Sequence, residues 1–133
     1  MTEMEKSELV IAKILSLLLE WGIQHSSLEF EELELDNEFA THFYPCLEWL
    51  ESEGIIRVKA YNRTIDGFAS GSVNQPVLSA YGMSILGQKT IANGDSEQLS
   101  EGIKKISSGE RSLWQVGDAI GGILGGLTKS LGS

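Results

Sequence analysis

The stretch from Glu5 to Gly22 constrains the fold more than any other part of the chain, because it predicts a long helix with a wide apolar face. Its apolar residues recur at helical spacing, and Lys6, Lys13 and Glu20 mark the polar side. Gly22 is typical of the C-terminal end of a helix. A face of this width needs cover from several directions, so we expect other elements to pack against this helix on more than one side.

Two further helical segments are predicted next. Residues 28–35 alternate apolar side chains with glutamates, as a strand does, but their glutamate-rich composition favours a short helix. A third element begins at residue 36 or 37 and runs to about residue 53. Pro45 lies inside it, and an interior proline removes a helical hydrogen bond and clashes with the preceding turn. We therefore expect either a kink near residues 42–44 or two separate helices.

A pair of strands and another helix are predicted after Gly54. β-branched residues indicate a strand over residues 55–61, and the following residues, 62–75, predict a loop rich in Gly, Ser, Asn and Asp. Residues 76–78 predict a short return strand, after which Ser79 caps a helix that runs to about Ile91. We therefore expect one domain of mixed helices and strands over residues 1–92.

Two local patterns resemble the winged-helix superfamily. The stretch Leu47–Val58 looks like the end of a recognition helix that runs into the first strand of a wing. The stretch Leu78–Leu86 is similar to the pattern L-[ST]-x-x-G-x-x-x-L, which leads from the second wing strand into the final helix. The order of the predicted elements is also the winged-helix order. The resemblance covers about residues 5–91 and implies an α+β fold, with a winged-helix-like helical core and a two-stranded wing.

Acidic charge is concentrated in the first part of the chain. The whole net charge of −9 lies in residues 1–60, which hold 13 acidic and 4 basic residues. The helix that matches the recognition helix has no lysine or arginine, and glutamates occupy most of its polar positions. A phosphate backbone repels such a helix, which also lacks the donors that usually bind base edges. The wing offers one basic cluster for contact with nucleic acid: Arg57, Lys59 and Arg63.

Residues 113–133 form a glycine-rich tail, predicted as helical, after a polar segment, 93–112, that predicts a linker or a short surface helix. The apolar residues of the tail fall on one helical stripe, and glycines recur every four residues, which lets another backbone approach closely. Each interior glycine disfavours a helix by about 1 kcal/mol relative to alanine, so the tail needs something to pack on. We predict that it packs on its own domain, a second subunit or a partner; a flexible tail and a tail on a membrane surface are the alternatives. The predicted contact residues are Leu113, Trp114, Val116, Gly117, Ile120, Gly121, Leu124, Gly125 and Leu127.

Neither a catalytic site nor a metal or cofactor site is predicted. His42 and Cys46 are four residues apart, but a structural zinc site takes four ligands and a thiol nucleophile needs an oriented base. We expect Cys46 to pack in the core instead. A single cysteine fits a reducing compartment, and Lys13 interrupts the apolar run that a secretory signal would need. A cytoplasmic protein is therefore expected.

Together these features predict a non-catalytic protein–protein interaction or adaptor protein that associates with itself through its tail. Its partner is then another protein or a second copy of the chain, and nucleic acid is not favoured. A DNA-binding transcriptional regulator that uses the weakly basic wing is the first alternative. A membrane-surface accessory protein, held at the membrane by the tail, is the second alternative.

Overall fold

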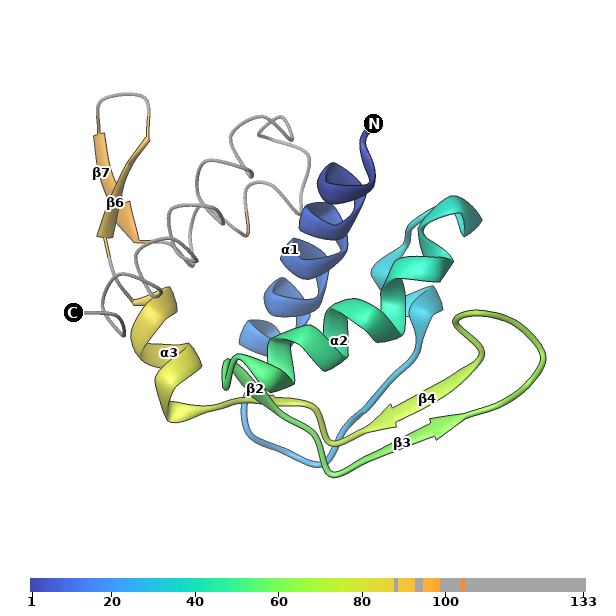
Figure 1. The fold of residues 1–133 in the computed structure, drawn as a ribbon. Helices are drawn as coiled ribbons and strands as arrows, with labels where there is room; N and C mark the ends of the chain where they lie inside the picture. The colour runs from blue at the N-terminus through green and yellow to red at the C-terminus, as the bar shows by residue number, and fades with distance from the viewer. Residues whose placement is uncertain (88, 93–94, 99–103, 105–133) are drawn as a thin grey trace.

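The computed structural model describes residues 1–87, 89–92, 95–98 and 104 (Figure 1). Its class is α+β, as predicted. The helices are α1 (Glu3–Trp21), α2 (Phe43–Ser52) and α3 (Ala80–Leu86), with two short 3-10 helices, η1 (Phe30–Leu33) and η2 (Asn37–His42). The strands are β1 (Ser27–Leu28), β2 (Ile56–Arg57), β3 (Ala60–Arg63), β4 (Gly71–Asn74), β5 (Val77–Leu78), β6 (Lys89–Ala92) and β7 (Asp95–Gln98).

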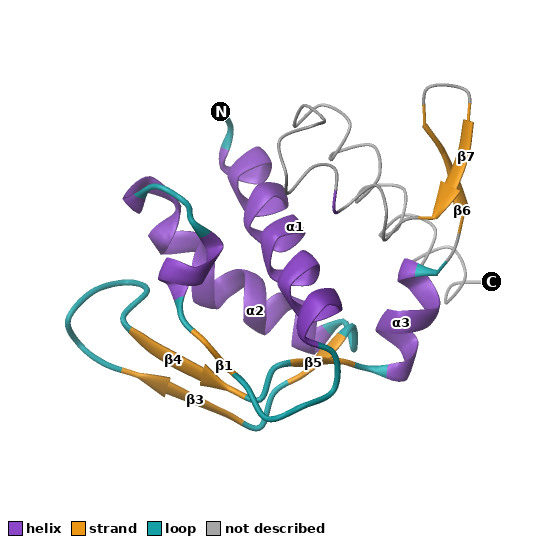
Figure 2. Ribbon diagram, turned by 180° about the vertical axis from the view of Figure 1, so that it is seen from behind, coloured by secondary structure: helices purple, strands orange, loops and turns teal. Residues whose placement is uncertain are grey.

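Helix α1 lies behind α2 in Figure 1 and in front of it in Figure 2, above strands β3 and β4 in both views. Thr2 caps α1: its hydroxyl accepts a hydrogen bond from Glu5 N at 3.1 Å, and the Glu5 carboxylate accepts one from Thr2 N at 3.0 Å. The helix packs against α2, η1, η2 and β5, which confirms the predicted cover from more than one side. Its buried residues are Val10, Ile11, Ala12, Ile14, Leu15 and Leu18.

The segment that follows is built from shorter elements than predicted. Residues 28–35 form the end of β1 and the four-residue η1, not one short helix, because Leu28 pairs with Val73 of β4. Residues 37–52 form η2 and α2, so the two-helix alternative is confirmed. Pro45 falls in the first turn of α2, where a helix leaves its N–H groups without intrahelical partners, and the ring therefore costs no hydrogen bond.

Strands β2 to β5 form one long hairpin in a single register. Arg57 pairs with Val77 and Ala60 pairs with Asn74, so the two pairs are separated by the same number of residues on both strands. The pairing is interrupted at residues 75–76, because Gln75 adopts a left-handed φ of 50° and the following proline has no N–H to donate. The strand predicted over residues 55–61 is therefore divided into β2 and β3.

Strand β4 lies within the stretch that was predicted as a loop. Residues 71–74 are poor in strand-forming side chains, but β3 pairs with β4 on one edge and β1 pairs with it on the other. The result is a three-stranded sheet in the order β1-β4-β3. Pairing on both edges thus outweighs the weak local preference of Gly-Ser-Val-Asn, and only residues 64–70 connect the two long strands.

Helix α3 begins as predicted but ends earlier. Ser79 caps it by accepting a hydrogen bond from Gly82 N at 2.9 Å. The predicted end near Ile91 is wrong, because α3 ends at Leu86 and the chain then forms the β6–β7 hairpin.

The sequence contains the signals for this second hairpin. Thr90 and Ile91 are β-branched residues, which prefer strands, and the dipeptide Asn93-Gly94 is the strongest short-range hairpin signal. Strand β7 occupies 95–98, where a linker or a short surface helix was predicted. The apolar residues that suggested the surface helix, Leu99, Ile103 and Ile106, lie outside the described residues.

A line of aromatic rings joins the helices to the hairpin. Phe30 of η1 meets Phe43 of α2 with ring centroids 5.6 Å apart, and the ring of Tyr44 lies 6.2 Å from that of Tyr61 in β3. Phe43 and Tyr44 are themselves 4.9 Å apart, and all three pairs are edge to face. The Tyr44 hydroxyl also donates a hydrogen bond to the carbonyl oxygen of Ser70 at 2.9 Å. Helix α2 is thereby fixed on one face of the hairpin.

Candidate functional site

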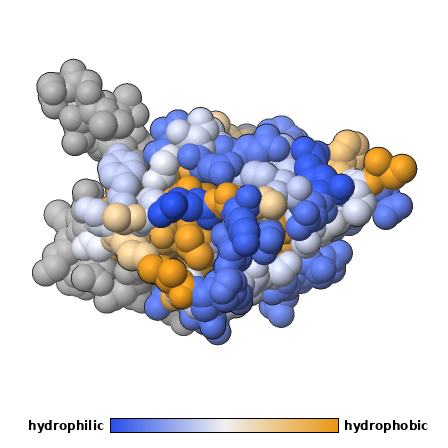
Figure 3. All heavy atoms as spheres, turned by 90° about the horizontal axis from the view of Figure 1, so that it is seen from below, coloured by the Kyte–Doolittle hydropathy of each residue, from blue (hydrophilic) through white to orange (hydrophobic). Residues whose placement is uncertain are grey.

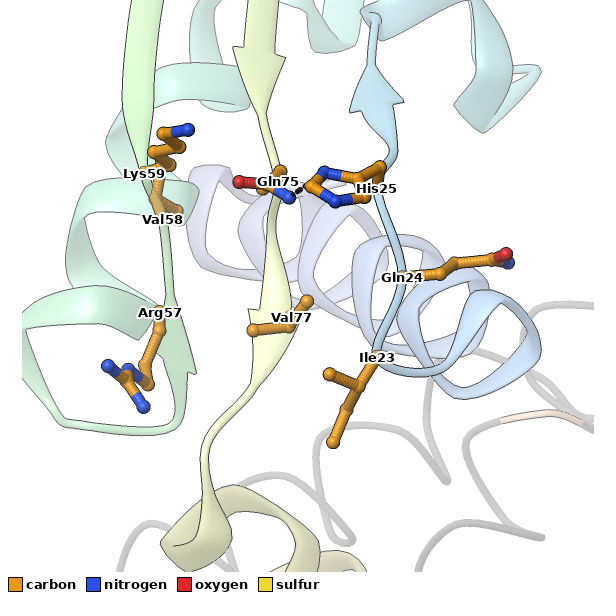
Figure 4. A pocket seen from close by; sticks show the side chains of 8 residues that line it. All are labelled: Ile23, Gln24, His25, Arg57, Val58, Lys59, Gln75 and Val77. Carbon is orange, nitrogen blue, oxygen red and sulfur yellow. Dashed lines mark hydrogen bonds between the residues drawn. The ribbon is translucent and has the colours of Figure 1, made fainter.

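Two of the three basic residues predicted for the wing line a pocket at the base of the hairpin. The pocket has a volume of about 460 Å³. It is formed by three segments: the connection from α1 to β1, the junction of β2 with β3, and the junction of β4 with β5 (Figure 4). Its lining residues are Ile23, Gln24, His25, Arg57, Val58, Lys59, Gln75 and Val77. We refer to it as the basic pocket.

Backbone hydrogen bonds hold the three segments of the basic pocket together. Lys59 N donates to Asn74 O at 3.0 Å, and Gln75 N donates to Ser26 O at 2.8 Å. Gln75, which has a left-handed φ of 50°, thus bonds through its N–H to the α1–β1 connection and not to the β2–β3 strand. Its side-chain amide nitrogen meets Nδ1 of His25, and its side-chain oxygen lies on the side of Lys59 (Figure 4). The basic pocket therefore lies where the pairing of the hairpin is interrupted.

Arg57 and Lys59 keep their charges available. Both side chains are exposed, and within the described part of the chain neither forms an ion pair. Arg57 is the last residue of β2 and Lys59 lies in the connection from β2 to β3, with Val58 between them. This is a cationic concavity in the otherwise acidic first half of the chain.

Arg63 lies apart from the other two basic residues. Its guanidinium group is 3.5 Å from the Glu48 carboxylate of α2 and 4.5 Å above the centroid of the Tyr44 ring. Beside it, the Tyr61 hydroxyl donates to the Glu51 carboxylate at 3.0 Å. Burial, and the bond to Glu51, raise the pKa of Tyr61, so its phenol remains a donor at neutral pH. Arg63 therefore belongs to the contact between α2 and the hairpin.

The tip of the hairpin exposes two large apolar side chains that were not singled out from the sequence. Ile65 is fully exposed and Phe68 is 73% exposed. The Ser70 hydroxyl organises the loop, since it donates to Thr64 O at 2.8 Å and accepts from Gly67 N at 3.1 Å. Figure 3, which shows the molecule from below, has apolar side chains at the projecting end of the hairpin and others beside hydrophilic ones over the lower face. The sequence signal that could have indicated these exposed side chains is the presence of large apolar residues in a loop that is rich in Gly, Ser and Asp.

Cys46 is buried, as predicted, and is not placed for nucleophilic chemistry. Its Sγ donates to Ser7 O at 3.6 Å, and burial raises the pKa of the thiol to about 11. His42 turns to another partner, with Nε2 2.8 Å from the Glu3 carboxylate. Among the residues that the structure describes, no group of three or more His, Cys, Asp and Glu side chains is arranged to hold a metal ion.

The contact residues predicted in the tail, Leu113 to Leu127, lie outside the described residues. None of the helices in the described ranges is both long and apolar enough to cross a membrane. Comparison of the chain with protein-family models, with curated proteins and with solved structures finds no match.

Proposed function

We propose that this chain is a non-catalytic, cytoplasmic protein-interaction or adaptor protein on a winged-helix-like scaffold. The scaffold is supported by the order of elements, in which α1, the short η1, the η2–α2 pair, the hairpin and α3 follow one another as in that superfamily. It is also supported by Gly82, the glycine of the L-[ST]-x-x-G pattern, which lies at the close approach of α3 to the backbone of Ile55.

The contact between Arg63 and Glu48 is the observation on which the choice of a protein partner depends. In the proposed scaffold helix α2 corresponds to the recognition helix, and it exposes Glu48 and Glu51 next to the hairpin. Arg63, the basic residue nearest to that helix, is paired with one of these carboxylates. A DNA backbone approaching this face meets negative charge, and the nearest positive charge is already compensated. A protein partner has no such repulsion to overcome.

The apolar tip of the hairpin supports the same choice. Protein interfaces draw much of their affinity from a few large side chains that become fully buried in the complex. Ile65 and Phe68 are exposed in the isolated chain and are held on a loop that the Ser70 hydroxyl organises. We expect Phe68→Ser to reduce capture of a partner from the native host, whereas Met83→Ser, at an exposed apolar residue of α3, leaves capture unchanged.

Titration of a labelled DNA duplex at several salt concentrations tests the choice between protein and DNA. We expect weak binding for the wild-type chain, with little dependence on salt. Glu48→Gln removes a carboxylate and releases Arg63, so it is expected to increase the binding of duplex. Tight wild-type binding that falls steeply with salt and is lost in Arg57→Gln or Lys59→Gln would instead establish the DNA-binding regulator.

Self-association through the tail is tested by removing residues 113–133. We expect the shortened chain to have a lower mass in solution than the full chain, measured by light scattering after size-exclusion chromatography. An unchanged mass and unchanged partners would refute the role given to Leu113–Leu127. Sedimentation of the full chain with anionic lipid vesicles, lost on removal of the tail, would favour the membrane-surface alternative.

A further inference from the structure

The basic pocket presents two exposed cations from adjoining segments of the hairpin. Arg57 ends β2 and pairs with Val77, and Lys59 lies between β2 and β3, where its N–H donates to Asn74 O at 3.0 Å. Figure 4 shows the two side chains diverging, with Val77 and Gln75 on the neighbouring segment beside them.

We propose that the basic pocket binds a short acidic segment of a protein partner, with one carboxylate on Arg57 and another on Lys59. Neither cation forms an ion pair among the described residues, so two acidic side chains of such a segment would compensate both charges. The inference rests on the proposed interaction function, because that function supplies a protein as the ligand. It assigns acidic side chains to the partner, whereas the apolar tip of the hairpin implies only an apolar contact.

The remaining lining residues suit the same ligand. Ile23 is 75% exposed, and Val58 and Val77 are half-buried, so an apolar surface lies beside the cations. The methylene groups of glutamate can cover such a surface while their carboxylates reach the cations. The Gln75 side chain, anchored on the ring of His25, presents its amide oxygen on the side of Lys59, where it can accept a hydrogen bond from a partner's backbone N–H.

A short acidic segment fits the basic pocket better than a small molecule or a nucleic acid does. Small-molecule sites bury most of the ligand surface, whereas this pocket leaves Ile23 and both cations open to solvent. A nucleic acid needs a longer track of positive charge, and Arg63, which lies apart from the basic pocket, is already paired with Glu48. A short acidic segment needs two compensating charges, which is the number that the basic pocket offers.

Titration of the ¹⁵N-labelled full chain with short peptides, acetylated and amidated at their ends, tests the inference. The first peptide has two glutamates separated by one leucine, and the second has glutamines in place of both glutamates. We expect the first peptide to shift the NMR signals of Arg57, Lys59 and the Gln75 side-chain amide. The second is expected to leave these signals unchanged, because it has no charge to compensate the two cations.

Variants locate the binding in the basic pocket. Arg57→Gln and Lys59→Gln are each expected to weaken binding of the first peptide by about threefold to fivefold, the range of an exposed charge pair. Gln75→Glu places a carboxylate beside Lys59 with little change of size and is expected to abolish binding. Lys104→Gln removes an exposed lysine outside the lining residues and is expected to leave binding unchanged. Circular dichroism establishes that each variant is folded.

Three results would overturn the inference. The first is absence of binding by the glutamate peptide, and the second is equal binding of the glutamate and glutamine peptides. The third is binding of a short oligothymidylate as tightly as the peptide with the same loss in Arg57→Gln, which would make the basic pocket a nucleic-acid site. If the peptide does not bind and the duplex binds only weakly, the role proposed for the basic pocket is refuted and the proposed interaction function stands. Tight duplex binding removes the proposed function itself.

Discussion

The environment of one thiol shows how burial sets chemistry at the scale of a residue. Cys46 lies in the first turn of α2 and packs against α1, with only 5% of its surface exposed. Burial raises the pKa of its thiol from an ordinary 9.0 to about 11, so the reactive thiolate is scarce at neutral pH. The helical spacing of His42 and Cys46 therefore does not pair a thiolate with a free imidazole in this fold, because His42 contacts Glu3 instead.

We predict that native Cys46 reacts slowly with an aromatic disulfide reagent at pH 8 and rapidly after unfolding in urea. Because its folded pKa is the higher one, the unfolded chain loses the thiol proton first as the pH rises. The thiol's contribution to stability is thus fully present below about pH 9 and is lost progressively as the pH rises toward about 11. Urea unfolding at a series of pH values measures this loss, and Cys46→Ala should lack it. Rapid labelling of the native chain would contradict the burial of the thiol.

Gly82 accounts for the glycine of the L-[ST]-x-x-G pattern. A Cβ atom at this position would lie 2.1 Å from the carbonyl oxygen of Ile55 and 3.0 Å from its carbonyl carbon. We predict that Gly82→Ala lowers the free energy of unfolding by about 2 kcal/mol or more, since α3 has to move away from the strand. Gly67→Ala is the control, because a Cβ there would meet no atom within 4 Å. Equal melting temperatures for the two variants would show that α3 does not approach Ile55 this closely.

At the scale of elements, the long hairpin is where local preference and tertiary pairing disagree most. Residues 71–74 have little strand preference, yet they occupy the centre of the β1-β4-β3 sheet. The interruption at Gln75 divides the hairpin without changing its register, and the basic pocket lies beside it. Pairing partners that are remote in sequence decide such features, because the hydrogen bonds of a central strand depend on both of its neighbours.

The bond between Tyr61 and Glu51 predicts how firmly α2 is held on the hairpin. Tyr61→Phe removes one hydrogen bond between the two elements and keeps the ring against Tyr44. We expect a loss of about 1 kcal/mol in the free energy of unfolding, measured by urea titration. Asn62→Ala, at the exposed neighbouring position, should change the free energy by less than about 0.5 kcal/mol. An unchanged free energy of unfolding in Tyr61→Phe would mean that this hydrogen bond adds no stability beyond that of the hydrogen bonds to water in the unfolded chain.

At the scale of the whole molecule, one apolar core beneath α1 holds the helices and the hairpin together. The core includes residues from α1, η1, η2, α2 and the strands, and α1 contacts most of these elements. Ile14 is completely buried in the middle of α1, whereas Ile65 is fully exposed at the tip of the hairpin. Ile14 therefore contributes to the core, whereas Ile65 does not.

We predict that Ile14→Ala lowers the free energy of unfolding by about 2–5 kcal/mol, because it removes buried apolar surface and leaves a cavity. Ile65→Ala should change the free energy by less than about 0.5 kcal/mol, because its side chain gains no burial on folding. Thermal and urea unfolding of the two variants measures the difference. A large loss in Ile65→Ala, which the exposed position does not predict, would show that the tip packs on another part of the protein.

Much of the helical part was predictable because its signals are local. The amphipathic period of α1, the division of residues 36–53 near residues 42–44 and the cap at Ser79 all follow from interactions within a few residues along the chain. The β4 strand was missed because the composition of residues 71–74 favours a loop, whereas the strand depends on pairing with β3. The early end of α3 was missed because the hairpin signal of Asn93-Gly94 was not given weight. The basic pocket was predictable only in part. Arg57 and Lys59 were predicted as a basic cluster, but His25 and Gln75 come from segments that are remote in sequence.

The sequence by itself determined the α+β class, the apolar face of α1, the acidic character of residues 1–60 and the burial of Cys46. Each of these depends on residue type and short-range spacing. Only the tertiary structure decided that Arg63 pairs with Glu48 while Arg57 and Lys59 remain unpaired among the described residues and line a pocket with His25 and Gln75. The physical reason is that charge compensation depends on distance in space, and the register of the hairpin sets those distances.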